Sequence, residues 1–290
     1  MLKFKEITIE DKEIIDSYFK KMGYQNSEAC FTTMFIWKDV VNIRFTIEDG
    51  FLLLTGQYKN HPPYAYFPTG EGDLKGVIEK LMEYFNHNGK KLVIKPLLDS
   101  TKKMVEELFP GKFSYREIRY SSDYIYLAED LINLKGKKYH AKKNHLNKFI
   151  STYDYEYVNI YPDEIKKYHE FMNNILDPDS IDEKIAMDNY FNNYSHFDNN
   201  KGAALIVNGQ IAAITFGEQL NSDTAVIHIE KANTDFQGSY AAINQMFVKN
   251  EWAHLKYINR EEDMGIEGLR RAKMSYRPIY ILDKYEAVQI

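Results

Sequence analysis

The sequence predicts an α+β fold of two similar halves, each a mixed, mostly antiparallel sheet flanked by helices. Two observations predict it. Segments with apolar residues at helical spacing alternate along the chain with short runs that read as strands. The order helix, hairpin, strand, turn, helix, strand, helix, strand then occurs twice, which indicates a duplication. With 290 residues, 44% of them hydrophobic, the chain is long enough for two cores.

In the first half, residues 10–22 form an amphipathic pattern that predicts a helix. Two strand-like runs follow, at 40–48 and 51–57, and Asp49-Gly50 between them is a hairpin signal. The remaining elements are predicted from the same patterns: strands near 64–69, 91–97, 115–120 and 123–128, and helices near 76–88 and 100–109.

In the second half, a strand at 155–161 precedes two helices, near 162–175 and 181–194. Residues 202–220 read as a hairpin through Asn208-Gly209, the signature of a type I′ turn. A long strand, a glycine turn, a helix, a short strand and a helix follow, and 278–290 reads as one closing strand. We expect a first domain at 1–133, without a cofactor site of its own, and a second at 134–290 that carries the active cleft.

Composition excludes several classes of protein. The formal net charge of −5 argues against a nucleic-acid coat over the whole surface. No apolar run approaches the ~18 residues of a membrane span, and the first residues do not resemble a secretory signal. The single cysteine, Cys30, cannot form a disulfide within the chain. We therefore expect a soluble, cytoplasmic protein.

The segment 134–149 would open the second domain. It carries six lysines and two histidines and no acid. Helical spacing would put Lys135, Lys138 and Lys142 on one stripe, whereas Tyr139, Leu146 and Ile150 could pack inward. One interpretation is a solvated linker helix, and the other is a docking surface for a polyanion.

Two glycine turns are candidate anion cradles, one in each half. In the second half, Gln237, Gly238, Ser239 and Tyr240 lie between a strand and a helix, where backbone N–H groups and a helix N-terminus could meet a phosphate. A plain helix cap is the alternative. The counterpart turn of the first half carries Glu71 and Asp73, which would repel a phosphate, so we expect the chemistry in the second half.

Arginines are scarce and clustered. Only seven are present, and four of them (Arg260, Arg270, Arg271 and Arg277) fall within eighteen residues. A helix over 265–277 would carry Arg270, Lys273 and Arg277 as a cationic stripe beside an apolar arc of Leu269, Ala272 and Tyr276, and would turn Arg271 away. Asp263 precedes that helix and could orient an arginine or accept a proton. An ordinary surface helix is the alternative.

A possible acid–base pair lies on the long strand. Strict alternation would put His228 and Glu230 on one face, where an imidazole and a carboxylate could exchange protons. Two solvent-facing polar residues would give the same pattern. No zinc-type histidine motif, Walker loop, nucleophile elbow or dinucleotide fingerprint occurs, so we expect no metal site.

The order strand, glycine turn, helix, short strand, helix resembles the GNAT acyltransferase fold, here doubled. The segments GKKYHAKKNHLNKF and NREEDMGIEGLRRAKMSYRP resemble more specifically the family of the phosphatidylglycerol lysyltransferase C-terminal domain, and the resemblance spans nearly the whole chain. It implies tandem GNAT-like domains and an activity that moves an activated acyl or aminoacyl group onto an amine or hydroxyl. The donor that it implies is an aminoacyl-tRNA or an acyl-coenzyme A, with no tightly bound cofactor.

The same resemblance suggests roles for individual residues. It points to Asp263, Arg270, Arg271 and Lys273 as the acidic and basic parts of the transfer cleft. To these we add Tyr276, as a donor of a proton to the leaving group, and Glu230 of the long strand as catalytic candidates of our own. Gln237, Gly238, Ser239 and Tyr240 hold the position where GNAT enzymes bind coenzyme A. The donor's phosphates would meet five residues: Lys138, Lys142, Lys143, Asn147 and Arg271.

Two further functions remain open from the sequence. One is a non-catalytic binder of tRNA or another phosphorylated ligand, because a fold alone does not confer activity. The other is a coenzyme A-dependent N-acetyltransferase of small molecules. Peripheral contact with lipid is compatible with all three.

Overall fold

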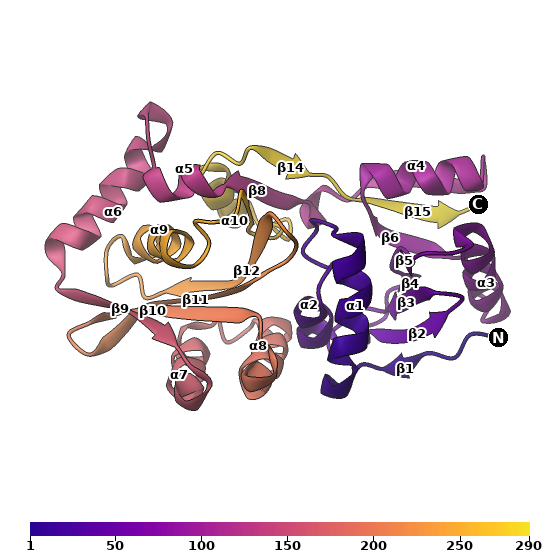
Figure 1. Cartoon of the computed structure of the whole chain (residues 1–290), viewed down its shortest axis with the longest axis horizontal. Helices are drawn as coiled ribbons and strands as arrows, with labels where there is room; N and C mark the ends of the chain where they lie inside the picture. The colour runs from indigo at the N-terminus through magenta and orange to yellow at the C-terminus, as the bar shows by residue number, and fades with distance from the viewer. The chain divides into compact units, whose positions relative to one another are not determined.

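The computed structural model describes residues 1–290 and divides the chain into two units (Figure 1). Unit 1 comprises Met1–Tyr24, Glu28–Asp123 and Leu282–Ile290, and unit 2 comprises Gln25–Ser27 and Tyr124–Ile281. The expected boundary between residues 133 and 134 thus differs from the observed division. Strand pairing is the physical reason, because it assigns the closing strand of each half to the other half's sheet.

The sheet of unit 1 runs in the order β1-β2-β3-β4-β6-β15-β7, with β5 paired to β3. Its strands are β1 (Lys5–Glu6), β2 (Arg44–Glu48), β3 (Phe51–Gly56), β4 (Tyr64–Ala65), β5 (Thr69–Gly70), β6 (Val93–Leu97), β7 (Phe113–Glu117) and β15 (Tyr285–Gln289). Its helices are α1 (Lys12–Met22), α2 (Phe31–Trp37), α3 (Leu74–His87) and α4 (Asp99–Leu108). Apolar residues of α3 and α4 share a core with β3, β6 and β15.

The glycine turn of unit 1 is closed by its own side chains. Asp73 caps α3 by accepting a hydrogen bond from the amide of Gly76 at 3.0 Å, and Glu71 forms an ion pair with Lys21. The N-terminal amide of α3 that could bind a phosphate is therefore already bound to the carboxylate of Asp73.

The sheet of unit 2 runs in the order β14-β8-β13-β12-β11-β10-β9. Its strands are β8 (Asp123–Leu127), β9 (Tyr155–Ile160), β10 (Asn200–Val207), β11 (Gln210–Gln219), β12 (Thr224–Ala232), β13 (Tyr257–Asn259) and β14 (Tyr280–Leu282). Neighbours from β9 to β12 are antiparallel, β12 and β13 are parallel, and β13 and β8 are antiparallel. The predicted mixed, mostly antiparallel sheets are confirmed.

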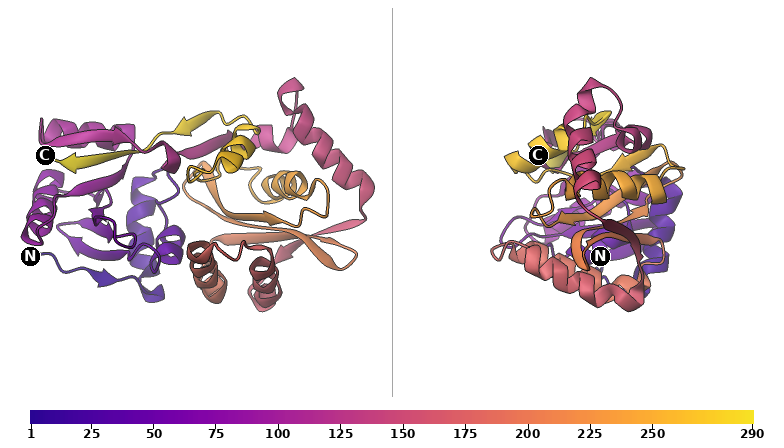
Figure 2. Two further views of the ribbon diagram at one scale, coloured as in Figure 1. Left: turned by 180° about the vertical axis from the view of Figure 1, so that it is seen from behind. Right: turned by 90° about the vertical axis from the view of Figure 1, so that its left-hand side faces the viewer.

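Helices cover both faces of this second sheet. They are α5 (Ala128–Asn133), α6 (His140–Thr152), α7 (Ile165–Ile175), α8 (Ile181–Asn193), α9 (Ser239–Glu251) and α10 (Glu267–Met274). Helix α9 lies on one face beneath α5 and α6, and α7 and α8 lie on the other face (Figures 1 and 2). The core on the α9 side includes Trp252, Phe247, Tyr124 and Tyr126.

Both predicted hairpins are confirmed. Asp49 and Gly50 join β2 to β3, and Asn208 and Gly209 join β10 to β11, with positive φ angles at all four residues, as a type I′ turn requires. The closing segment differs from the prediction of a single strand. It forms β14 in the second sheet and β15 in the first.

The helices of the chain include none with the length and apolar character that a membrane crossing needs.

Candidate functional site

A bulge in β12 decides which polar side chains meet. Phe216 on β11 is paired with Ile229 and the next residue, Gly217, with Ile227, so that His228 is the extra residue. Ile227 belongs to the core beneath α9, and Glu230, three residues later, contacts Asn244 of α9. The expectation that His228 and Glu230 act together on one face is therefore wrong, because the bulge interrupts the alternation.

Glu230 is the centre of a buried polar group on the α9 side. Its carboxylate accepts a hydrogen bond from Asn244 Nδ2 at 2.8 Å and one from Arg260 NH2 at 2.7 Å. The side chains of Glu230 and Arg260 are only 12% and 11% exposed. The second terminal nitrogen of Arg260 and Oδ1 of Asn244 are buried without a hydrogen-bond partner. Such unpaired atoms are costly, so the group has unused capacity for a ligand or water.

Two cations lie over one aromatic ring of this group. Lys142 Nζ is 4.1 Å and Arg260 Cζ is 4.6 Å from the ring centre of Tyr276. Burial lowers the pKa of the Lys142 ammonium, and the charge of Arg260 lowers it further, although Glu230 opposes both. Two positive charges and one negative charge leave the group one positive charge in excess. An anion or a developing oxyanion would balance it.

Asp263 forms a second buried group with Arg270. Its carboxylate accepts a bidentate pair of hydrogen bonds from Arg270, at 2.8 and 3.1 Å, one from the Tyr124 hydroxyl at 2.6 Å and one from the Gly265 amide at 2.8 Å. Burial alone would raise the pKa of Asp263, but these hydrogen bonds hold it at about 2. A carboxylate so fully engaged is a weak base. The geometry therefore supports a role in which Asp263 orients Arg270, rather than one in which it removes a proton.

Lys273 joins the two groups through the backbone. Its ammonium donates to the carbonyl of Arg260, and the Tyr126 hydroxyl donates to the carbonyl of Lys273 at 2.8 Å. The chain thus brings the five expected catalytic residues into two neighbouring groups: Glu230 lies on β12, Asp263 precedes α10, Arg270 and Lys273 lie on α10, and Tyr276 follows it. Within α10, Ala272 is exposed rather than part of an apolar arc, and Leu269 is half-buried.

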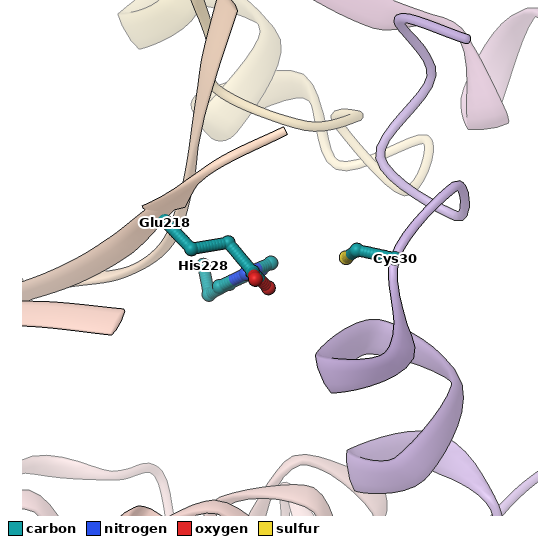
Figure 3. Close-up of side chains that lie close together, drawn as sticks. All are labelled: Cys30, Glu218 and His228. Carbon is teal, nitrogen blue, oxygen red and sulfur yellow. The ribbon is translucent and has the colours of Figure 1, made fainter. Parts of the chain in front are cut away.

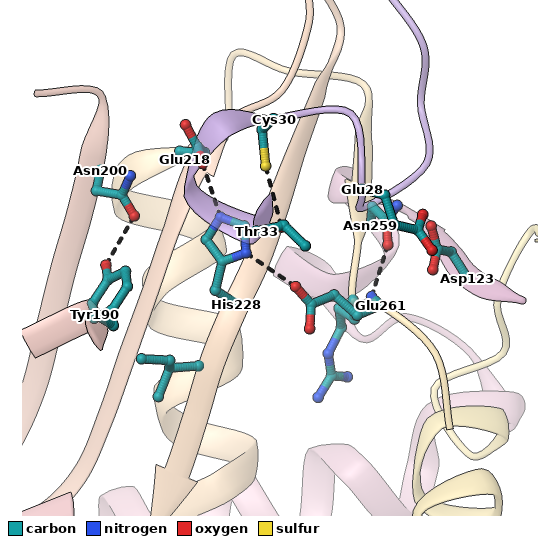
Figure 4. A network of polar contacts seen from close by, with 12 residues as sticks. Glu28, Cys30, Thr33, Asp123, Tyr190, Asn200, Glu218, His228, Asn259 and Glu261 are labelled. Atoms are coloured by element: carbon teal, nitrogen blue, oxygen red, sulfur yellow. Dashed lines mark hydrogen bonds and ion pairs between the residues drawn. The ribbon is translucent and has the colours of Figure 1, made fainter. Parts of the chain in front are cut away.

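A third group surrounds His228. Its Nε2 lies 3.0 Å from Glu218 Oε1 and its Nδ1 lies 3.0 Å from Glu261 Oε1. Glu218 and His228 approach each other from adjacent strands (Figure 3), and Glu261 reaches the other ring nitrogen (Figure 4). The amide of Glu261 donates to Asn259 Oδ1 at 2.7 Å, which fixes the backbone there. Consecutive residues Arg260 and Glu261 therefore serve two different groups.

The basic segment forms an exposed surface on α6 and the turn before it. Tyr139, Leu146 and Phe149 anchor it in the core, whereas Ile150, which was expected to pack inward, is 44% exposed. Lys143 and Asn147 are exposed, and Lys138 forms an ion pair with Asp130 at 3.2 Å. Of the expected donor-binding residues, Lys142 alone reaches the Arg260 group.

Arg271 lies apart from that group. Its side chain is 75% exposed and faces Glu267 one helical turn away, at 3.6 Å. The prediction that it turns away from the Arg270 stripe is confirmed.

The glycine turn at 236–240 is closed by contacts within unit 2. The amide of Gln237 donates to the Tyr153 hydroxyl at 3.1 Å, and that of Ser239 to the carbonyl of Phe236. Ser239 Oγ donates to the carbonyl of Asn233 and does not cap the helix. A Cβ added to Gly238 would lie 2.2 Å from the carbonyl oxygen of His145 on α6. That electronegative atom would oppose a phosphate at this turn. Tyr240 is 40% exposed.

The site contains residues that the sequence did not single out for it. Glu218, Asn244, Glu261, Tyr124 and Tyr126 are separated in the chain and meet only through strand pairing and helix packing. Arg260 had a signal, as a member of the arginine cluster, but its partner Glu230 is 30 residues away.

A model of the family described as "Phosphatidylglycerol lysyltransferase, C-terminal" matches residues 19–288. The structure is similar to that of a conserved protein of unknown function from Bacteroides thetaiotaomicron VPI-5482, at 36% identity and a TM-score of 0.94, over 100% of both chains. Among curated proteins, the uncharacterized protein MYCGA3080 of Mycoplasmoides gallisepticum is 25% identical over 171 residues. That match covers 57% of this chain and 55% of the other, so the chain spans about half the length of that relative.

Two more distant structures share the fold. L-PGS from Bacillus licheniformis is 13% identical, with a TM-score of 0.67 over 96% of this chain and 92% of the other. A tandem GNAT protein from the clavulanic acid biosynthesis pathway is 9% identical, with a TM-score of 0.53 over 100% of this chain and 98% of the other. The tandem GNAT-like fold is thereby confirmed.

Proposed function

The chain belongs to the family of phosphatidylglycerol lysyltransferase C-terminal domains, and from this premise we propose that it is an aminoacyltransferase. Family and fold support an acyltransferase of the GNAT and lysylphosphatidylglycerol synthase kind. The finer proposal is that the donor is an aminoacyl-tRNA and the acceptor an amine or a hydroxyl.

The excess positive charge around Tyr276 carries the proposal. Acyl transfer from an ester passes through a tetrahedral intermediate with a negative oxygen, and preorganised donors that face this oxygen lower the barrier. Lys142 and the unpaired nitrogen of Arg260 are such donors, held in a buried site where charges act strongly.

Tyr276 suits the protonation of the leaving oxygen. Burial raises the pKa of its hydroxyl, although Arg260 opposes the shift, and the hydroxyl stays protonated at neutral pH. Such a weak acid can still protonate an alkoxide, which is a strong base. Asp263 would hold Arg270 at the cleft, where its partly exposed guanidinium can bind an anionic part of donor or acceptor.

Helix α6 and the segment before it support tRNA as the donor. Lys135, Lys137, Lys143 and Lys148 are exposed and have no carboxylate within 4.0 Å, so their charge is available to phosphates. Lys142 of α6 reaches the Arg260 group. A tRNA on this surface would therefore have its charged end near the oxyanion site. The closed turn at Gly238 disfavours coenzyme A.

Binding measurements test the donor. We expect charged tRNA to bind more tightly than the same tRNA without its amino acid, with an affinity that falls as salt rises. The double variant Lys143→Gln/Lys148→Gln should weaken binding and reduce the slope of log K against log salt by about 1.4 to 1.8, as expected for two lost phosphate contacts.

Lys166→Gln/Lys184→Gln is the matched control, because both lysines are exposed on α7 and α8 and have no ion pair. Its affinity and salt slope should equal those of the wild type. Stabilisation by acetyl-coenzyme A and none by tRNA would contradict the proposal. Equal binding of charged and uncharged tRNA, without turnover, would favour a binding module.

A further inference from the structure

The ion pair between Glu230 and Arg260 has a single hydrogen bond. Glu230 Oε1 accepts it from Arg260 NH2 at 2.7 Å, whereas the other terminal nitrogen of Arg260, NH1, is buried without a hydrogen-bond partner. An arginine that meets a carboxylate commonly forms two parallel hydrogen bonds with it. Arg270 does so with both oxygens of Asp263, at 2.8 and 3.1 Å. The single bond of Arg260 therefore needs a cause.

Asn244 of α9 supplies that cause. Its Nδ2 donates to the second carboxylate oxygen of Glu230, Oε2, at 2.8 Å. Asn244 is 2% exposed, and α9 packs against β11 and β12, so its amide is held firmly in the core. The Glu230 carboxylate is thus turned so that Oε1 bonds Arg260 and Oε2 bonds α9. The second oxygen forms no hydrogen bond with NH1.

Two aromatic rings keep the guanidinium group in place. Its Cζ lies 5.5 Å from the ring centre of Tyr126 and 4.6 Å from that of Tyr276, and the two rings are nearly perpendicular, at 87°. Such rings attract a cation but are poor hydrogen-bond acceptors. Because NH1 is buried and unpaired, it would gain from a second bond to Glu230. A turn of the Glu230 carboxylate is the movement that would supply this bond.

We propose that Asn244 is a positioning residue, which keeps NH1 of Arg260 free by holding the second oxygen of Glu230. Without its amide, the carboxylate turns and binds Arg260 through both oxygens. The donor that NH1 offers to the negative oxygen of the transfer reaction is then lost. This catalytic consequence rests on the proposed function, whereas the state of the Arg260 nitrogens does not.

Nuclear magnetic resonance of 15N-labelled arginine tests the state of NH1 in the free protein. The chain has only seven arginines, and Arg260→Lys assigns the signals of this one. In the wild type we expect the NH1 protons to lie upfield of the NH2 protons, because only NH2 is hydrogen-bonded. In Asn244→Leu the NH1 protons should move downfield, as expected for a new bond to Glu230.

Gln245→Leu is the matched control. Gln245 is the next residue of α9, and its amide donates to the carbonyl of Ile132, outside the Arg260 group. This variant should leave the signals of Arg260 unchanged. The signals of Arg270 should be the same in the wild type and both variants, which shows that the fold around α10 is intact.

Kinetics test the link to catalysis. Asn244→Leu should lower kcat for transfer from charged tRNA by about 100-fold, the cost of losing one oxyanion donor, with little change in KM for the tRNA. Gln245→Leu should keep the wild-type values of both.

Asn244→Asp separates positioning from a merely structural role and keeps the size of the side chain. The new carboxyl group faces Glu230, and two facing carboxyl groups take up one shared proton as the pH falls. That proton then replaces the hydrogen bond from Nδ2, whereas at higher pH the two carboxylates repel each other. The ratio of variant to wild-type kcat should therefore rise as the pH falls, and the NH1 protons should return toward their wild-type position.

The two failures are distinguishable. If the NH1 protons kept their wild-type position in Asn244→Leu, and at every pH in Asn244→Asp, the positioning role would be overturned, whatever the donor is. If they moved as expected but the wild type gave no transfer from charged tRNA, the proposed function would be overturned instead. A wild-type kcat in Asn244→Leu with displaced NH1 protons would remove the free nitrogen from the mechanism.

Discussion

Asp263 illustrates what one buried carboxylate contributes. Its four hydrogen bonds, from Arg270, Tyr124 and Gly265, leave it ill-suited to accept a proton but well suited to hold Arg270 in place. The sequence placed Asp263 correctly near the start of α10 and left its role open. Only the contacts decide between the two roles, because spacing does not reveal how many donors a carboxylate meets.

Asp263→Asn should therefore destabilise the protein by about 2 kcal/mol at pH 7. The pKa of Asp263 is lowered in the folded state, so the folded protein binds this proton less readily than the unfolded chain. Its stabilising contribution is present above pH 4 and is lost as the pH falls toward 2. In urea unfolding of the wild type and Asp263→Asn, the difference between their free energies of unfolding should therefore become smaller as the pH falls from 4 toward 2.

Glu267→Gln is the control for that measurement, since Glu267 is 81% exposed and its ion pair with Arg271 is long. It should change stability by less than about 0.5 kcal/mol. If the difference in free energy of unfolding between Asp263→Asn and the wild type stayed constant down to pH 2, it would contradict the lowered pKa assigned to Asp263.

The positions of His228 and Glu230 are an example of what the sequence alone does not predict about single residues. Alternation placed them on one face, and one bulged residue separates them into two polar groups. A bulge depends on pairing with β11, which is not a local property of the β12 sequence.

At the scale of elements, most helices, strands and hairpins are predictable because their signals are local. Helix α2 is an exception: its seven residues are largely buried all round, so it lacks a polar face that would reveal a helix. Near the end of α6 the buried residue is Phe149, whereas the sequence predicted Ile150. The buried face of the helix is therefore displaced by one residue from the predicted one.

The junction of α6 and α9 gives a prediction at this scale. Gly238 has φ of +91°, and a Cβ there would meet the carbonyl oxygen of His145 at 2.2 Å. Gly238→Ala should therefore destabilise the protein by about 2 kcal/mol or more in urea unfolding. Two costs combine: the left-handed backbone and the clash with α6.

Gly268→Ala is the matched control, because Gly268 lies within α10 and nothing is within 4 Å of its added Cβ. It should be neutral or stabilise by up to about 1 kcal/mol. Equal effects of the two substitutions would show that α6 does not pack on Gly238 as described.

At the scale of the whole molecule, the repeated order of helices and strands is visible in the sequence, but the assignment of strands to sheets is not. β8 closes the first half in sequence and pairs with β13 in the second sheet. β15 closes the second half and lies between β6 and β7 in the first sheet. Local patterns predict that each segment is a strand, whereas its partner depends on contacts far apart in the chain.

The central claim is that unit 2 transfers an aminoacyl group from tRNA. The most direct measurement follows the label of tRNA charged with isotopically labelled amino acids, with an extract of lipids and small molecules as acceptors. We expect the wild type to move the label to a new amide or ester and to leave intact, uncharged tRNA, and Tyr276→Phe to slow this transfer at unchanged folding. Label that remains on the tRNA, while acetyl-coenzyme A acetylates acceptors in the same extract, would contradict the account.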